Sequence, residues 1–303
     1  MRTLRRLFLI GGLLALGCTG LSDSAAQKVP QLPDTVELVR DLEYGKGGDR
    51  ALKLHILRPK SAPKEAMPVL VWIHGGGWQA GNKDSGIRLL TRFAERGYFC
   101  ASIEYRFSQE AVFPAQIEDC KCAIRFLRAR AKEYNLDPDR IGVWGASAGG
   151  HLVALLGTSA NVKELEGKGG WPEHSSRVQA VCDYCGPADF LKWADKSHPA
   201  VVKLFGGPVS EKKDLAAKAS PVTHISKDLP PILIVHGDED KIVPLDQSES
   251  LLAVLKKAGA DATLHVVKGG GHGFGGPEID KLVDDFFDKH LKAGKTKKET
   301  EGK

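Results

Sequence analysis

The sequence predicts an α/β fold in which helices cover both faces of a mostly parallel β-sheet. Segments with strand patterns and segments with helix patterns alternate between residues 36 and 291, which is typical of a parallel sheet with crossover helices. The segments 69–73 and 232–235 are short, continuously apolar and rich in β-branched residues, as are strands that are covered on both faces. No low-complexity linker interrupts this region, so we expect one domain over 36–291.

The individual elements follow from the periodicity of the apolar residues. Segment 51–57 alternates apolar and polar residues, as a half-buried strand does. Segment 189–220 breaks the alternation of strands and helices and is rich in charge, which predicts a small helical insertion over one edge of the sheet. The expected strands are 36–42, 51–57, 69–73, 99–105, 141–144, 180–184, 232–235 and 262–267, and the expected helices are 87–96, 116–134, 148–156, 247–258 and 278–291.

Length, composition and charge exclude several classes of protein. The chain has 303 residues, 42% of them hydrophobic and six of them cysteine, which excludes a disulfide-stapled miniprotein, a disordered chain and a collagen-like repeat. The net charge of +5 lies at the two ends, with three arginines in residues 1–26 and six lysines in 289–303, whereas the residues between carry a net charge of −1. Basic ends on a nearly neutral domain do not make a phosphate-binding surface, so we expect no nucleic-acid partner.

Residues 1–26 predict an export signal. Arginines precede an apolar stretch at 7–16 that is too short to span a bilayer, and small residues at 24–26 offer a cleavage site. Cys18 suggests the alternative of a lipid anchor, but the two residues before Gly17 fit that pattern poorly. We therefore favour a secreted or periplasmic protein. No later apolar run is long enough for a membrane helix, so no transmembrane segment is expected after the signal is removed.

Two further segments and the cysteines complete the domain organisation. Residues 27–35 are expected to form an N-terminal extension, and residues 292–303, rich in Lys, Glu, Thr and Gly, a disordered basic tail. Cys120 and Cys122 lie on an expected helix, where a spacing of two does not place both sulfurs on one face. The remaining cysteines show no ligand spacing either, so we expect buried free thiols and no zinc site.

Ser147 is the predicted nucleophile. It lies in the sequence GASAG at 145–149, between the expected strand 141–144 and the expected helix 148–156. A serine on a sharp turn from a strand to a helix needs small residues two positions before and after it, because larger side chains collide with the strained backbone. The context of the motif, more than the motif itself, points to nucleophilic catalysis.

The sequence HGGGW at 74–78 follows directly on an apolar strand and predicts an anion-binding loop. Three glycines allow backbone N–H groups to approach a ligand, since no Cβ obstructs them. With a nucleophilic serine downstream, the expected anion is the oxygen of a tetrahedral acyl intermediate. Gly76 and Gly77 are the expected donors, with Ala148 at the helix N-terminus as a third. The loop lacks the Lys-Ser/Thr ending of a phosphate-binding loop.

His272 is the predicted general base. A serine hydroxyl is a poor nucleophile until a base removes its proton, and His272 lies on a glycine-rich loop before the last helix. His151 lies one helical turn after Ser147 and is expected to be structural. His74 and His236 each end a buried strand, where hydrogen bonding to the backbone is the commoner role. An acid must also orient the base, and Asp238 and Asp240 follow the strand 232–235.

Three motifs together resemble the α/β-hydrolase esterases of the hormone-sensitive-lipase and bacterial feruloyl-esterase-like groups: HGGGW at 74–78, FPAQIEDCK at 113–121 and GASAGGHL at 145–152. The resemblance covers about 36–291. It implies a Ser-acid-His triad, no metal or organic cofactor, and hydrolysis of carboxylic esters, with some members acting on acetyl or feruloyl groups of plant polysaccharides. The family's HG-x-x-D-x-x-V-P arrangement at 236–244 favours Asp240 as the acid, and Asp238 is then expected to brace the turn.

The sequence thus predicts an exported serine esterase that acts through an acyl-enzyme on a small-molecule or polysaccharide-linked ester, with acetyl or feruloyl groups favoured. Trp78 and Phe274 flank the two site loops and are the candidates for lining the substrate pocket. One alternative is a peptidase, because HG-x-x-D-x-x-V-P also resembles prolyl-oligopeptidase-type enzymes. Another is a catalytically silent binding protein on the same fold.

Overall fold

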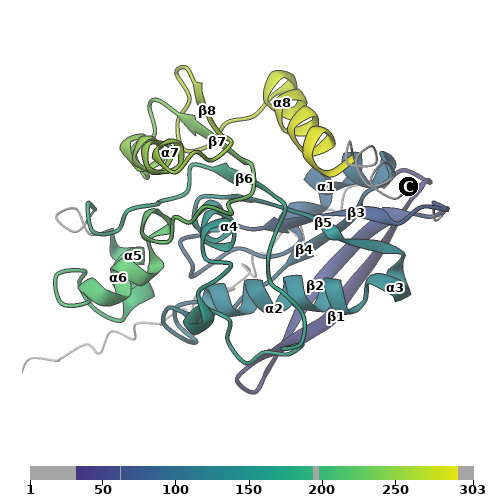
Figure 1. Cartoon of the computed structure of the whole chain (residues 1–303), viewed down its shortest axis with the longest axis horizontal. Helices are drawn as coiled ribbons and strands as arrows, with labels where there is room; N and C mark the ends of the chain where they lie inside the picture. Colours follow the sequence, from purple (N-terminus) through teal and green to yellow (C-terminus); the bar gives the residue numbers. More distant parts are fainter. Residues whose placement is uncertain (1–31, 62, 194–197, 293–303) are drawn as a thin grey trace, which may run out of the picture. The chain divides into compact units, whose positions relative to one another are not determined.

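A single mixed sheet of eight strands organises the chain (Figure 1). The computed structural model describes residues 32–61, 63–193 and 198–292. The strand order across the sheet is β1-β2-β4-β3-β5-β6-β7-β8. The strands are β1 (Val36–Gly47), β2 (Arg50–Pro59), β3 (Met67–Ile73), β4 (Phe99–Ile103), β5 (Leu136–Ala146), β6 (Ala180–Tyr184), β7 (Ile232–Gly237) and β8 (Ala262–Val267).

The predicted α/β fold with a mostly parallel sheet is confirmed. Six adjacent strands, β4, β3, β5, β6, β7 and β8, pair in parallel. At one side of the sheet, β1 pairs antiparallel with β2, and β2 pairs antiparallel with β4. Because β3, β5, β7 and β8 are parallel, their carboxyl ends lie along one edge of the sheet. The loops that carry the candidate site residues all leave from this edge, as ligand sites in open α/β sheets do.

Helices cover both faces of the sheet (Figure 1). On one face α1 and α8 pack against a core that includes Trp72 and Trp144. On the other face α2, α4 and α7 pack against a second, larger core. The helices are α1 (Ser85–Glu95), α2 (Ala115–Ala129), α3 (Ala131–Tyr134), α4 (Ala148–Thr158), α5 (Pro199–Phe205), α6 (Lys213–Ala219), α7 (Asp246–Lys257) and α8 (Pro277–Phe287), with 3₁₀ turns at Lys163–Leu165 and Pro221–Thr223 and a π-helical turn at Asp288–Lys292.

The central strands are apolar because both of their faces are covered. Every residue of β3 and of β7 is buried, which explains why their sequences do not alternate. Each fully buried aliphatic side chain of this kind contributes roughly 1.5–3 kcal/mol to stability. The loops that leave these two strands are therefore held on a rigid support.

Several element boundaries differ from the sequence prediction. The expected helix 116–134 is divided into α2 and α3 at Arg130, whose φ of −94° and ψ of 10° leave the helical region. Strand β1 extends five residues beyond its predicted end, and its register shifts between Val39 and Leu42, near Asp41 with its positive φ of 56°. A bulge of this kind inserts extra residues without ending the strand, so periodicity alone does not reveal it.

The predicted insertion at 189–220 contains two short helices, α5 and α6, in its described part. It lies at the carboxyl edge of the sheet, where α5 packs beside the glycine loop that follows the central strand β3. A Cβ atom added to Gly77 would lie 3.2 Å from the Cβ of Ala200 in α5, and the ammonium group of Lys203 donates a 2.9 Å hydrogen bond to the side chain of Gln79. The insertion therefore supports the glycine loop.

Some sequence predictions fall on residues outside the described ranges. These are the export signal at 1–26 with Cys18, the first part of the expected extension, and the tail from 293 onward. None of the helices in the described ranges is both long and apolar enough to cross a bilayer. The five cysteines in these ranges are all buried free thiols, as the sequence predicted.

Candidate active site

Ser147 occupies a strained turn between β5 and α4. Its backbone has φ of 56° and ψ of −120°, a conformation that non-glycine residues rarely adopt. Its backbone N–H donates a 2.7 Å hydrogen bond to the carbonyl oxygen of Tyr184 at the end of β6. This bond fixes the turn to the neighbouring strand, so that the side chain projects from the carboxyl edge of the sheet.

The glycines two positions before and after Ser147 are required by close backbone contacts. A Cβ atom at Gly145 would lie 2.4 Å from the carbonyl oxygen of Gly149. A Cβ atom at Gly149 would lie 2.0 Å from the carbonyl oxygen of Ile73 at the end of β3. Glycine at 145 thus avoids a collision within the turn, as expected from the sequence, and glycine at 149 allows α4 to pack directly against β3.

The structure brings Ser147, His272 and Asp240 together in one hydrogen-bonded chain. The Nε2 atom of His272 lies 2.8 Å from Oγ of Ser147, and its Nδ1 atom lies 2.7 Å from Oδ2 of Asp240. An imidazole that donates from Nδ1 to a carboxylate has Nε2 free to accept a proton from the hydroxyl group. The three residues come from positions separated by up to 125 residues in the sequence.

Asp240 is held in place by the loop that follows β7. Its other oxygen, Oδ1, accepts backbone N–H groups from Ile242 and Val243 at 2.8 and 2.9 Å. Its Oδ2 atom also lies 3.3 Å from Nε2 of His236, a contact that the sequence analysis missed. His236 donates from the same nitrogen to the carbonyl oxygen of Val243 and receives the hydroxyl proton of Ser248 on Nδ1.

The alternatives to these three residues lie elsewhere. Asp238 accepts the backbone N–H of Gly269 at 2.7 Å and pairs with the exposed Lys268, so it braces the start of the loop that carries His272. The imidazole of His74 donates to the carbonyl oxygen of its neighbour Gly75, and burial lowers its pKa. His151 is fully buried. These histidines have the backbone and packing roles that the sequence predicted.

The glycine loop lies directly against the Ser147 turn. A Cβ atom at Gly75 would lie 3.3 Å from the Cβ of Ser147. Gly76 and Gly77 have positive φ angles of 112° and 60°, which glycine adopts at little cost. Neither backbone N–H of these two residues has a hydrogen-bond acceptor within the described ranges. Ala148 begins α4, where the helix leaves its N–H without an intrahelical partner.

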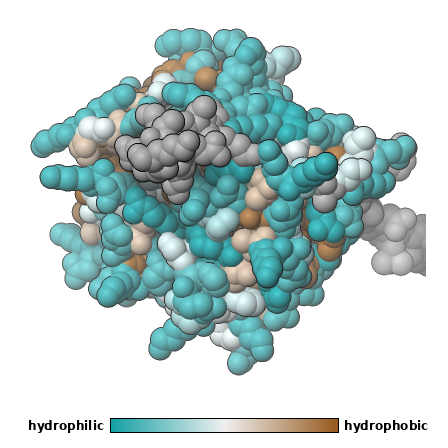
Figure 2. All heavy atoms as spheres, turned by 45° about the vertical axis from the view of Figure 1, so that its right-hand side comes forward, coloured by the Kyte–Doolittle hydropathy of each residue, from teal (hydrophilic) through white to brown (hydrophobic). Residues whose placement is uncertain are grey.

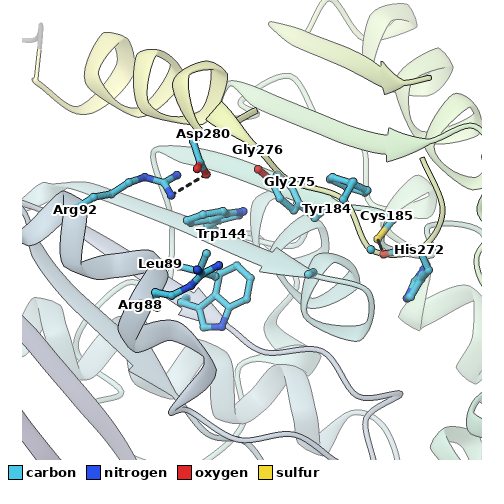
Figure 3. Close-up of a pocket in the computed structure, with 14 residues that line it drawn as sticks. Arg88, Leu89, Arg92, Trp144, Tyr184, Cys185, His272, Gly275, Gly276 and Asp280 are labelled. Carbon is cyan, nitrogen blue, oxygen red and sulfur yellow. Dashed lines mark hydrogen bonds and ion pairs between the residues drawn. The ribbon is translucent and has the colours of Figure 1, made fainter. Parts of the chain in front are cut away.

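A pocket of about 420 Å³ opens beside His272 (Figure 3). Phe274 and the glycines that follow it form one wall, and α1 contributes the opposite wall. Trp72, Trp144 and Tyr184 line it with aromatic rings. Its volume lies in the range of small-molecule sites. Phe274 and His272 both line this pocket.

Trp78 does not line this pocket, contrary to its selection as a candidate. Its side chain is only 3% exposed, and its indole N–H donates a 3.1 Å hydrogen bond to Nδ1 of His151. The ring also packs near Phe190 from the insertion, with ring centres 5.8 Å apart. Trp78 belongs to the core behind the glycine loop because α4 and the insertion close over it.

Cys185 is a neighbour of the site that the sequence analysis did not select. It follows β6 with a positive φ of 44°, and its thiol lies 3.6 Å from the carbonyl oxygen of His272. Burial raises the pKa of this thiol well above its usual range. The sulfur of Cys185, one carboxylate oxygen of Asp240 and one ring nitrogen of His272 lie within 4.8 Å of one another, a spacing that could hold a metal ion. Asp240 and His272, however, are already joined by the hydrogen bond described above.

Comparison with known proteins shows that this chain is similar to esterases. Residues 54–255 match the model of the BD-FAE family. A probable carboxylic ester hydrolase of Mycobacterium tuberculosis, LipM, is 37% identical over 224 residues, which make up 72% of this chain and 51% of that protein. The chain spans about half the length of the curated relatives it matches.

Two solved structures are similar over most of their own length. A truncated carbohydrate esterase from gut microbiota superposes with a TM-score of 0.78 at 36% identity and covers 84% of this chain and 97% of its own. An esterase of Thermogutta terrifontis with bound propionate gives a TM-score of 0.70 at 27% identity, covering 84% of this chain and 94% of its own.

Proposed function

This chain belongs to the BD-FAE family of α/β-hydrolase esterases, and on that premise we propose that it hydrolyses carboxylic esters with Ser147 as nucleophile, His272 as base and Asp240 as the acid that orients the base. The observation that carries this proposal is the continuous hydrogen-bonded chain from the Ser147 hydroxyl through His272 to Asp240. Such a chain supplies what a serine lacks on its own, a base in reach and a fixed tautomer of that base.

The reaction proceeds through an acyl-enzyme. As Oγ of Ser147 attacks the ester carbonyl carbon, its proton passes to Nε2 of His272, and the carboxylate of Asp240 stabilises the imidazolium that forms. The backbone N–H groups of Gly76, Gly77 and Ala148 stabilise the negative oxygen of the tetrahedral intermediate. His272 then protonates the leaving alcohol. Water attacks the acyl-enzyme by the same route, which releases the carboxylic acid and regenerates the serine.

The proposed substrates carry short-chain or carbohydrate-linked acyl groups of the acetyl or feruloyl type. The similar solved structures include a carbohydrate esterase and an esterase with bound propionate, and a pocket of about 420 Å³ suits a small group. The face of the molecule in Figure 2 is mainly hydrophilic. Export through residues 1–26 to the periplasm or the exterior is part of this proposal.

Replacement of the nucleophile tests the proposal. Ser147→Ala should lower the hydrolysis of 4-nitrophenyl acetate by at least about a thousandfold while folding is retained. Ser210→Ala, which changes an exposed serine before α6, is the matched control and should keep full activity. Normal activity in Ser147→Ala would exclude the assignment.

The same variants separate the esterase from its alternatives. The wild type, but not Ser147→Ala, should react with a fluorophosphonate probe, whereas a catalytically silent protein would not react. A panel from acetyl to octanoyl esters with methyl ferulate measures acyl preference. A proline 4-nitroanilide assayed in parallel should remain uncleaved, and faster cleavage of this anilide than of the esters would favour a peptidase.

A further inference from the structure

Arg88 presents an uncompensated positive charge in the pocket beside His272. It lies on α1, its side chain is exposed, and it lines the pocket (Figure 3). Among the arginines in the described ranges, Arg88 alone has no hydrogen bond, ion pair or aromatic contact for its guanidinium group, whereas every other one has at least one of these. A guanidinium without a partner is available to an anionic ligand.

The other charges of the pocket wall compensate one another. Arg92 donates to Asp280 at 2.8 Å and to Asp284 at 2.9 Å. Asp280 is the one carboxylate among the pocket-lining residues, and its ion pair with Arg92 is drawn in Figure 3. Because Arg92 and Asp280 neutralise each other, the guanidinium of Arg88 is the positive charge that remains for a ligand in the pocket. The imidazole of His272 also lines this pocket.

A second, independent observation concerns the N–H group of Trp144. This side chain is only 1% exposed and lines the same pocket, and its Nε1 atom has no hydrogen-bond partner among the described residues. A buried donor without an acceptor costs about 1–3 kcal/mol. The guanidinium of Arg92 lies 5.3 Å from the centre of the Trp144 ring, and its Nη2 atom is also buried without a partner in the described part of the chain. Both atoms lie in the wall of the pocket with almost no exposed surface, so an acceptor group in the ligand reaches them only when side chains of the wall shift.

We propose that this pocket binds a carboxylate carried by the ester substrate and that Arg88 is the residue that selects for it. The inference rests on the proposed function and specifies the substrate class of the same site. Arg88 supplies the charge, and the aromatic side chains of Trp72, Trp144 and Tyr184 line the pocket beside it. A planar carboxylate matches the fork of a guanidinium group.

The carboxylate has two possible sources in an ester. It belongs either to the alcohol part, as in an acylated uronic acid, or to the acyl part, as in a half-ester of a dicarboxylic acid. Two matched substrate pairs separate these sources. O-acetylated galacturonate is compared with O-acetylated galactose, and 4-nitrophenyl hemisuccinate is compared with 4-nitrophenyl butyrate. Within each pair the chief difference is the negative charge.

The measured quantity is the ratio of kcat/KM for the charged and the neutral member of each pair. In one pair the wild type should favour the charged member by about tenfold, as expected of a charge-assisted hydrogen bond from a partly exposed guanidinium. Arg88→Gln should bring this ratio close to one. Arg177→Gln, which removes an equal charge just before β6, at the opposite end of that strand from the site, should keep it. A ratio that is equal in the wild type and in Arg88→Gln for both pairs overturns the proposal.

Direct binding distinguishes a failure of this inference from a failure of the proposed function. Galacturonate, succinate and neutral galactose are titrated into Ser147→Ala, with tryptophan fluorescence as the readout, and then into the double variant that also carries Arg88→Gln. If the wild type hydrolyses none of the esters but carboxylates still bind in a way that depends on Arg88, only the proposed function is overturned. Esterase activity without such binding would overturn only the carboxylate selectivity.

Discussion

The indole N–H of Trp78 donates a hydrogen bond to Nδ1 of His151 across 3.1 Å. The other ring nitrogen of His151 donates to the carbonyl oxygen of Ala219 at the end of α6, at 2.8 Å. These two contacts fix His151 as a neutral imidazole with its proton on Nε2. A single buried histidine thereby joins the glycine loop, the helix that follows Ser147 and the insertion that packs on both.

This arrangement predicts a loss of stability in acid. Burial lowers the pKa of His151 to about 4, whereas an unfolded histidine titrates near pH 6.5. Between these values the unfolded chain binds a proton that the folded protein does not, so stability falls as the pH falls. The contribution of His151 should reach about 1.4 kcal/mol per pH unit in this window.

Urea unfolding from about pH 7 to about pH 4.5 measures this contribution. His151→Gln and His151→Asn remove the titration, so the stability of the wild type relative to either variant should fall with acidification. The slope is the readout, and a lower stability of the variants at neutral pH does not affect it. Parallel pH curves for the wild type and both variants would contradict the prediction.

Asp183 should change the pH dependence of stability in the opposite direction. Its Oδ1 atom accepts the backbone N–H of Gly186 at 2.9 Å, but its Oδ2 atom is buried and has no partner within residues 32–61, 63–193 and 198–292. Burial raises the pKa of this carboxyl to about 7, so the folded protein retains a proton that the unfolded chain releases near pH 4. The stabilising contribution is complete below pH 4 and is lost as the pH rises to about 7.

Comparison with Asp183→Asn isolates this contribution. The wild type should lose stability relative to the variant as the pH rises through this window, by up to about 1.4 kcal/mol per pH unit. Because His151 and Asp183 act with opposite signs over overlapping ranges, the pH profile of the wild type alone conceals both. A difference that does not change with pH would show that Asp183 is ionised in the folded protein at all these values.

Adding a single methyl group at Gly149 should severely destabilise the protein. A Cβ atom there would lie 2.0 Å from one backbone carbonyl oxygen and 2.7 Å from the next, both at the end of β3. Backbone atoms of a buried strand cannot yield as a side chain can, so Gly149→Ala should destabilise the protein by more than about 3 kcal/mol or displace the Ser147 turn.

Gly207→Ala is the matched control for this substitution. An added Cβ atom there meets only the flexible side chain of Lys212, at 3.1 Å, and the change should alter stability by less than about 1 kcal/mol. Thermal unfolding and 4-nitrophenyl acetate hydrolysis are measured on both variants. A Gly149→Ala protein with normal stability and activity would show that α4 can move away from β3.

The sequence predicts the strands of the fold and the three residues of the hydrogen-bonded chain better than it predicts the residues around them. Strands β6 and β8 have the predicted boundaries. The fully buried β6 carries the strong local signal of a parallel strand with both faces covered. The approach of His272 to Ser147 follows from chain order on the resembling fold. The break at Arg130 was missed because it interrupts the backbone without interrupting the pattern of apolar residues.

Residues whose role depends on distant neighbours could not be predicted in the same way. Trp78 was selected for the pocket because it adjoins the glycine loop, but the insertion and α4 enclose it. His236 was read as the end of a strand, and its contact with Asp240 depends on the return of the following loop. Arg88 has no local motif at all. Its significance lies in the absence of a partner, which only the packing of α1 and α8 reveals.

The pair Asp238 and Asp240 offers the sharpest test of the orienting acid, because two aspartates in one loop have different surroundings. Asp240 is buried and accepts from His272. Asparagine at 240 would present an amide that cannot stabilise an imidazolium and that favours the wrong tautomer of His272. We expect Asp240→Asn to lower kcat by about ten-thousandfold, the size of the same change in a serine protease triad.

Asp238→Asn is the control within the same loop. The side-chain amide oxygen can still accept the N–H of Gly269, and only the pair with exposed Lys268 is weakened. Surface pairs of this kind contribute little, so kcat should stay within about twofold of the wild type. Circular dichroism shows whether both variants are folded. If Asp238→Asn instead abolished activity and Asp240→Asn did not, the acid would lie at 238, and the loop would have to reorganise when substrate binds.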